Sequence, residues 1–139
     1  MRNQRGITLI ALVITIIVLL ILAGVSIAML TGDNGILSNA QRSSRETAIA
    51  NTKEKISTAV NEAMTNYYAN VYVDNGSDGM FDKVATAIYG CTGEDGVTIE
   101  FSPASKPSPA EQVTVTLKYN NTETVATGTL SDKGSFKWN

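Results

Sequence analysis

The chain contains one long apolar run near its beginning. Residues 7–32 form twenty-six consecutive positions without a charged side chain. As an α-helix this run is about 39 Å long. The hydrocarbon core of a bilayer is about 30 Å thick and needs only about 20 apolar residues to cross it. A helix that is apolar on every face does not suit the surface of a small soluble domain. The run therefore predicts a transmembrane helix over residues 7–32.

The charges that flank the run predict its orientation. Arg2 and Arg5 precede it, and Asp33 follows it. Because positive charge stays on the cytoplasmic side, we expect the N-terminus inside and residues 33–139 outside. A cleaved secretory signal is one alternative, but its apolar core has about 7–15 residues. A plain signal-anchor for an extracytoplasmic domain is the other alternative.

The residues around the start of the run are more specific than its hydropathy. Residues 4–12 read Gln-Arg-Gly-Ile-Thr-Leu-Ile-Ala-Leu. This segment resembles the leader junction of the type IV pilin and pseudopilin family, in which a short basic leader ends in glycine before an apolar helix. The resemblance implies that prepilin peptidase cuts between Gly6 and Ile7 and methylates the new amine of Ile7. Glycine at Gly6 also permits an extended backbone close to a protease.

One position departs from the family pattern. The fifth residue after the implied cut is usually glutamate in this family, and its carboxylate is thought to pair with the N-terminal amine of a neighbouring subunit. Here that position is Ala11. We expect the amine of Ile7 to find another acceptor, such as the Thr8 hydroxyl or a carbonyl. Ala11 favours a minor or tip subunit, or a lineage that assembles differently.

The remaining sequence predicts a second helix and a small domain. Residues 31–35 contain two glycines and two turn-forming polar residues, so they break the helix. This break is either a hinge or the boundary of the membrane segment. Helical spacing of apolar residues then runs from Ile36 to about Tyr72. The predicted organisation is a leader over 1–6, a transmembrane helix over 7–32, a break and an amphipathic helix over 33–72, and a β-rich globular domain over 73–139.

Alternation of apolar and polar residues predicts the strands of that domain. We expect strands over 97–101, 113–119, 123–130 and 135–138, the third weakened by Gly128. Residues 80–89 form a short helix or, alternatively, end in a strand, and 102–109 form a proline-rich loop. The predicted fold class is α+β: a long helix packed on an antiparallel sheet of three or four strands, as in pilins. We expect the following side chains to pack against this sheet: Tyr67, Tyr68 and Tyr72.

The composition argues against catalysis and against nucleic-acid binding. The chain has no histidine, one cysteine and a net charge of −2. The commonest general base is therefore absent, and we find no nucleophile or phosphate-binding motif. The basic residues form no patch. We expect no enzymatic activity, no cofactor and no direct contact with nucleic acid. Cys91 has no internal disulfide partner, so it is either a buried apolar residue or an intermolecular bridge.

Calcium is the one metal that the sequence suggests. Asp74, Asp78 and Asp82 surround Gly79 in a turn-forming segment. The EF-hand pattern requires an oxygen ligand two positions after the first aspartate and glutamate at the twelfth position. Gly76 and Ala85 occupy those positions. The competing interpretation is a solvated turn that precedes the next helix.

Together, these features predict a structural subunit of a type IV pilus-like or type II secretion-like filament. The implied partners are other subunits, prepilin peptidase, a membrane assembly platform and, before assembly, lipid. The expected location is the cell membrane, with a single pass, and then a surface filament. Small residues support close helix packing in such a filament; they are Gly24, Ser26 and Ala28. The alternative is a membrane-anchored extracytoplasmic binding module that does not polymerise.

Overall fold

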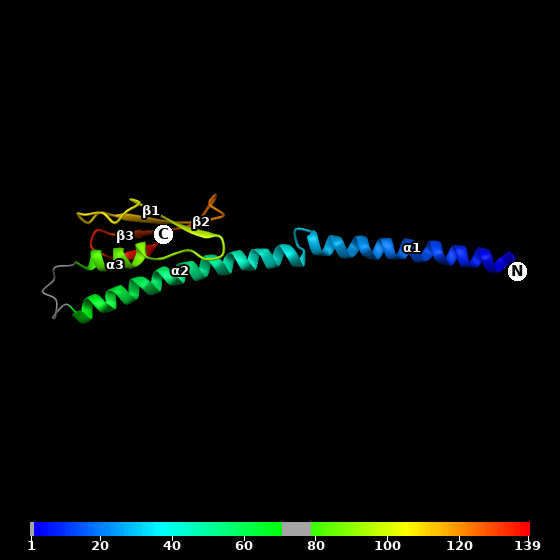
Figure 1. Ribbon diagram of the computed structural model, residues 1–139, viewed down its shortest axis with the longest axis horizontal. Helices are drawn as coiled ribbons and strands as arrows, with labels where there is room; N and C mark the ends of the chain where they lie inside the picture. Colours follow the sequence, from blue (N-terminus) through cyan, green and yellow to red (C-terminus); the bar gives the residue numbers. More distant parts are fainter. Residues whose placement is uncertain (1, 71–78) are drawn as a thin grey trace. The chain divides into compact units, whose positions relative to one another are not determined.

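A computed structural model describes residues 2–70 and 79–139 (Figure 1). The chain divides into two compact units, Met1–Ser44 and Arg45–Asn139. Helix α1 spans Arg2–Thr31, and α2 begins at Ile36 in the first unit and continues through the second to Asn70. The predicted continuation of this helix to Tyr72 lies outside the described residues. The second unit adds helix α3 (Met80–Tyr89) and four strands: β1 (Val97–Ser102), β2 (Val113–Tyr119), β3 (Glu123–Leu130) and β4 (Phe136–Trp138).

The four strands form one antiparallel sheet in the order β1-β2-β3-β4. Each strand pairs with its neighbour in sequence, so the sheet is a meander. Asn120 and Asn121 connect β2 to β3 with φ angles of 51° and 60°. This left-handed backbone suits a tight hairpin turn, and asparagine tolerates it better than most residues do. The predicted α+β fold with a small antiparallel sheet is confirmed.

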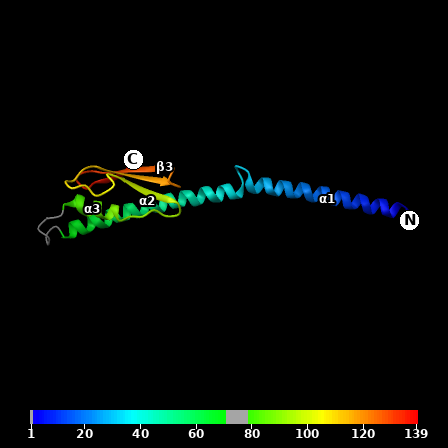
Figure 2. The same ribbon diagram turned by 45° about the horizontal axis from the view of Figure 1, so that its top comes forward.

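The helical part of the second unit packs on one face of this sheet. Figures 1 and 2 both show α3 and the C-terminal part of α2 on the same side of it. Helix α2 contains no glycine or proline and six alanines, which favours an uninterrupted helix. Its buried residues follow a spacing of three or four: Ala48, Thr52, Ile56, Val60 and Ala63. Helix α3 contributes Phe81, Val84, Ala85 and Ile88 to the same core. Residues 80–89 are therefore helical throughout, and the alternative of a strand at their end is wrong.

Strand β4 attaches to the rest of the domain through its aromatic residues. The rings of Phe136 and Trp138 meet edge to face, with centroids 5.1 Å apart. Both lie against Gly128 of β3, where an added Cβ would be 2.6 Å from Phe136 and 3.0 Å from Trp138. Trp138 Nε1 also donates a hydrogen bond to Ser57 Oγ of α2 at 3.2 Å. The absence of a side chain at Gly128 thus leaves room for both rings.

The tyrosines at the end of α2 are less buried than expected. Tyr68 is 62% exposed, so its predicted packing against the sheet is wrong. Tyr67 is half-buried and meets the ring of Tyr68 edge to face at 5.5 Å. Tyr72 lies outside the described residues.

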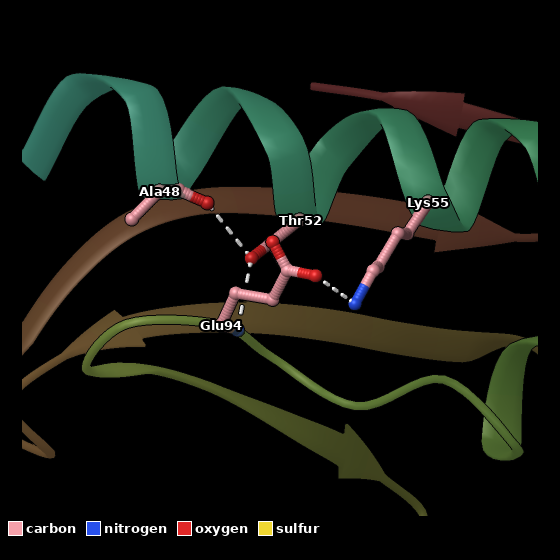
Figure 3. A network of polar contacts seen from close by, with 4 residues as sticks. All are labelled: Ala48, Thr52, Lys55 and Glu94. Carbon is pink, nitrogen blue, oxygen red and sulfur yellow. Dashed lines mark hydrogen bonds and ion pairs between the residues drawn. The ribbon is translucent and has the colours of Figure 1, made fainter. Parts of the chain in front are cut away.

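A buried hydroxyl joins α2 to the loop before β1. Thr52 is fully buried, and its Oγ1 donates to the carbonyl oxygen of Ala48 at 2.8 Å. The same oxygen accepts the backbone N–H of Glu94 at 3.4 Å, and the Glu94 carboxylate pairs with Lys55 (Figure 3). Because the part-buried N–H of Glu94 gains an acceptor on the buried side of the helix, Thr52 fixes where this loop meets α2.

We predict that Thr52→Val lowers the free energy of unfolding of the domain by about 1–2 kcal/mol, because the Glu94 N–H loses its acceptor without a change in side-chain volume. The measurement is urea unfolding of the full chain in detergent, followed by the fluorescence of Trp138, the single tryptophan. Thr65→Val is the matched control, since Thr65 is exposed on the same helix and bonds only to the carbonyl of Asn61. Equal effects of the two substitutions would contradict the role of Thr52.

Candidate functional site

The candidate site is helix α1, because its large apolar side chains are exposed. Every side chain from Gln4 to Thr31 is exposed. Its large apolar side chains are between 47% and 69% exposed, compared with about 5% or less for most of the second unit's core. By length and composition this helix can cross a membrane. A soluble domain buries such residues, so α1 has the surface of a helix that meets lipid or other helices.

The polar side chains of this apolar run are satisfied within the helix. Its four hydroxyls all donate to the carbonyl four residues earlier, at 2.7–2.9 Å; they belong to Thr8, Thr15, Ser26 and Thr31. In a hydrocarbon environment an unsatisfied polar group costs several kcal/mol. Hydroxyls that bond back to their own helix avoid this cost. The helix therefore carries its hydroxyl groups into an apolar environment without needing a partner.

The residues of the predicted cleavage junction lie in the first turns of α1. Gly6 and Ile7 are both helical and exposed, with Ile7 at 65%. An added Cβ at Gly6 would meet nothing within 4 Å, and the same holds at Gly24. The fold therefore does not require glycine at position 6. Because glycine weakens a helix by about 1 kcal/mol relative to alanine, it makes local unwinding at this junction easier.

Ala11 lies one turn after Ile7 and is exposed. Its carbonyl oxygen accepts the hydrogen bond of the helix backbone. It also accepts a hydrogen bond from the Thr15 hydroxyl at 2.7 Å. Between Gly6 and Gly32 no side chain carries a charge. Any neighbour of this segment therefore meets an uncharged surface.

The three small residues near the end of α1 do not share one face. Gly24 and Ala28 are four residues apart, so they lie one above the other on the helix. Ser26 lies between them in sequence and points away from that face, with its hydroxyl bonded to the Leu22 carbonyl. The expected stripe of three residues is therefore a pair, Gly24 and Ala28.

The break after α1 is an ordered turn. The N–H of Gly32 donates to Ala28 O at 3.0 Å, and the N–H of Gly35 donates to Gly32 O at 2.7 Å. Gly35 is buried, and an added Cβ there would lie 2.7 Å from the carbonyl oxygens of both Met29 and Leu30. Only glycine allows this close approach of the backbone.

The hydroxyl of Ser38 closes the turn from the side of α2. Its Oγ lies within hydrogen-bond distance of three carbonyl oxygens: Gly32 at 3.1 Å, Asp33 at 2.9 Å and Gly35 at 3.0 Å. The sequence analysis missed this role and read the segment only as a break. The available signal was a serine three residues after the second glycine of Gly-Asp-Asn-Gly.

The remaining candidate residues lie away from α1. Asp74 and Asp78 of the calcium hypothesis lie outside the described residues, and Asp82 pairs with Lys106 at 3.3 Å. Within residues 2–70 and 79–139, no three aspartate, glutamate or cysteine side chains converge as metal ligands would. Cys91 is half-buried, and its thiol donates to the Ala87 carbonyl at 3.3 Å. Burial raises the pKa of the Cys91 thiol, and the nearby positive charge of Lys55 opposes this rise.

The comparison with known proteins also points to helix α1. The family model of the prokaryotic N-terminal methylation motif matches residues 1–27. No curated protein and no solved structure matches the chain. The match contains Gly6, Ile7 and Ala11 and ends inside α1. The chain therefore carries, at its N-terminus, the methylation motif that is the signature of type IV pilins and pseudopilins.

Proposed function

We propose that this protein is a structural subunit, a pilin or minor pseudopilin, of a type IV pilus-like or type II secretion-like filament. One observation carries the proposal: α1 has the methylation motif at its start and an apolar surface that its own chain leaves uncovered. Lipid covers that surface before assembly, and the helices of neighbouring subunits cover it afterwards. The role is structural, and it requires neither a catalytic residue nor a cofactor.

Processing precedes assembly in this proposal. Prepilin peptidase cuts between Gly6 and Ile7 on the cytoplasmic side and methylates the amine of Ile7. The cut also removes Gln4, whose carbonyl accepts the Thr8 hydroxyl at 2.8 Å. Thr8 then has a free hydroxyl one residue from the new amine. We propose this hydroxyl as a local partner for the amine in a subunit that has Ala11 in place of glutamate.

Assembly exchanges lipid for helix, with little hydrophobic gain. The attraction between subunits therefore depends on close packing, for which Gly24 and Ala28 leave room on one face of α1. An assembly platform in the membrane moves the subunit into the filament. The domain of residues 45–139 is then displayed on the filament at the cell surface.

Gly6→Val is expected to abolish processing, because the fold tolerates a side chain at Gly6 and only the peptidase requires its absence. The measurement is the mass and N-terminal sequence of the protein from membranes of cells that contain the peptidase. The wild type should begin with methylated Ile7, and the variant should keep residues 1–6. Gly24→Val is the matched control, since it places the same side chain in equally open space on the same helix. A wild-type protein that keeps its first six residues, or one cut near Ala28, would overturn the proposal.

Cross-linking within α1 separates a filament subunit from a binding module that does not polymerise. The variant Ile14→Cys with Val25→Cys, in a Cys91→Ala background, offers two thiols per chain. A head-to-tail assembly joins successive copies through different surfaces, so a thiol cross-linker should produce a ladder of covalent multimers. Each single-cysteine variant should stop at a dimer. Monomers alone from the double variant, in cells that contain the assembly machinery, would favour the binding module.

A further inference from the structure

The apolar surface of the first unit does not end with α1. Ile36 and Leu37 follow the turn at Gly32–Gly35, and they are 75% and 47% exposed. Ile36 is more exposed than Met29, which at 69% is the most exposed large apolar side chain of α1 from Gln4 to Thr31. From Ser38 onward the helix becomes polar, with Asn39, Gln41 and Arg42. Exposed apolar residues are therefore found on both sides of the polar turn: in α1 before it, and at Ile36 and Leu37 after it.

The turn between these two apolar regions satisfies its own backbone. Ser38 offers one hydroxyl proton to three carbonyl oxygens, so it keeps a partner through small rearrangements of the turn. The N–H of Asn39 donates to the carbonyl of Gly35 at 3.1 Å. The close approach of Gly35 to Met29 and Leu30 leaves no room for a side chain at this position. In bulk water such carbonyls are hydrated at no cost, whereas in an apolar environment they need internal donors.

The length of α1 places the turn at the edge of a bilayer. Residues 7–31 span about 37 Å as a helix, against about 30 Å for the hydrocarbon core and 40–45 Å for the membrane with its headgroups. With Ile7 at one edge of the hydrocarbon core, the turn reaches the opposite headgroup layer. Asp33 and Asn34 are exposed there and suit its polar part.

We propose that the turn at Gly32–Gly35 lies in this headgroup layer, and that Ile36 and Leu37 bind phospholipid at the boundary between headgroups and acyl chains. The lipid-contacting surface would then extend from Ile7 to Leu37. This inference rests on the membrane anchoring in the proposed function. It adds that α2 begins in the membrane interface, and that Ser38 makes this possible by supplying the hydrogen bonds that water provides elsewhere.

Depth-dependent fluorescence quenching tests the position of Ile36. The probe is a nitrobenzoxadiazole fluorophore on Ile36→Cys in the full chain with Cys91→Ala, reconstituted into phosphatidylcholine vesicles with spin-labelled lipids. Val18→Cys and Thr58→Cys are the controls for the middle of α1 and for an exposed part of α2. We expect a headgroup spin label to quench Ile36 most strongly, an acyl-chain label to quench Val18, and neither to quench Thr58.

The outcomes distinguish this inference from the proposed function. Quenching at Val18 with none at Ile36 would overturn the interface position and leave the anchor intact. No quenching at Val18 would overturn the anchor as well. A third outcome is a fluorophore at Ile36 that is shielded from water, that no spin label quenches, and that loses its shielding when the protein is diluted in lipid. It would show that a second copy covers this site, and it would also overturn the inference.

Ser38→Ala tests the environment of the turn independently. In vesicles we expect amide hydrogen exchange at Gly35 and Asn39 to become about tenfold faster, because the turn carbonyls lose their donor in a region with little water. Ser44→Ala, at an exposed position on the same helix, should leave these rates unchanged. Unchanged exchange in Ser38→Ala would mean that water replaces the hydroxyl freely, and it would overturn the interface position.

Discussion

The structure depends on an apolar surface that the chain does not bury. The large apolar side chains of α1 are exposed, and an exposed apolar surface of this size favours lipid or other helices as its surroundings. This requirement explains the absence of charge between Gly6 and Gly32 and the pairing of each hydroxyl with its own helix. It also explains why the second unit needs a core of its own. That core lies between the sheet and the helices α2 and α3.

In each unit a side-chain hydroxyl satisfies backbone polar groups: Thr52 in the domain, and Ser38 in the turn after α1. In the domain, the buried Thr52 hydroxyl accepts a backbone N–H from a distant loop and so joins two elements. In the turn after α1, the Ser38 hydroxyl donates to carbonyls of its own segment. The first arrangement specifies tertiary structure, because its partner is forty-two residues away. The second lets a short segment satisfy its own carbonyl oxygens.

Much of the fold followed from local patterns in the sequence. The apolar run predicted α1, a short helix was one of the two alternatives for residues 80–89, and alternation predicted β2. These signals are local because the side chains of one element share one face. The motif at Gly6 and Ile7 is also a contiguous pattern, and the family model recognises it.

The features that local patterns did not predict depend on contacts between elements. Gly128 resembled a defect in a strand until β4 placed two rings against it. Tyr68 directly follows Tyr67 and so falls outside the series of buried positions of α2, which are three or four residues apart. The role of Ser38 depends on a turn whose carbonyls converge only when Gly35 packs against the end of α1.

The hydrogen bond between Trp138 and Ser57 has a consequence for synthesis of the protein. The strands pair in sequence order, so each can join the sheet soon after it leaves the ribosome or the membrane. Ser57, in contrast, waits for a partner eighty-one residues later. Until Trp138 arrives, β3 lacks the two rings that cover Gly128, and part of the core is open to solvent. Helix α1 thus precedes the domain in synthesis, and the core of the domain closes only once β4 has joined the sheet.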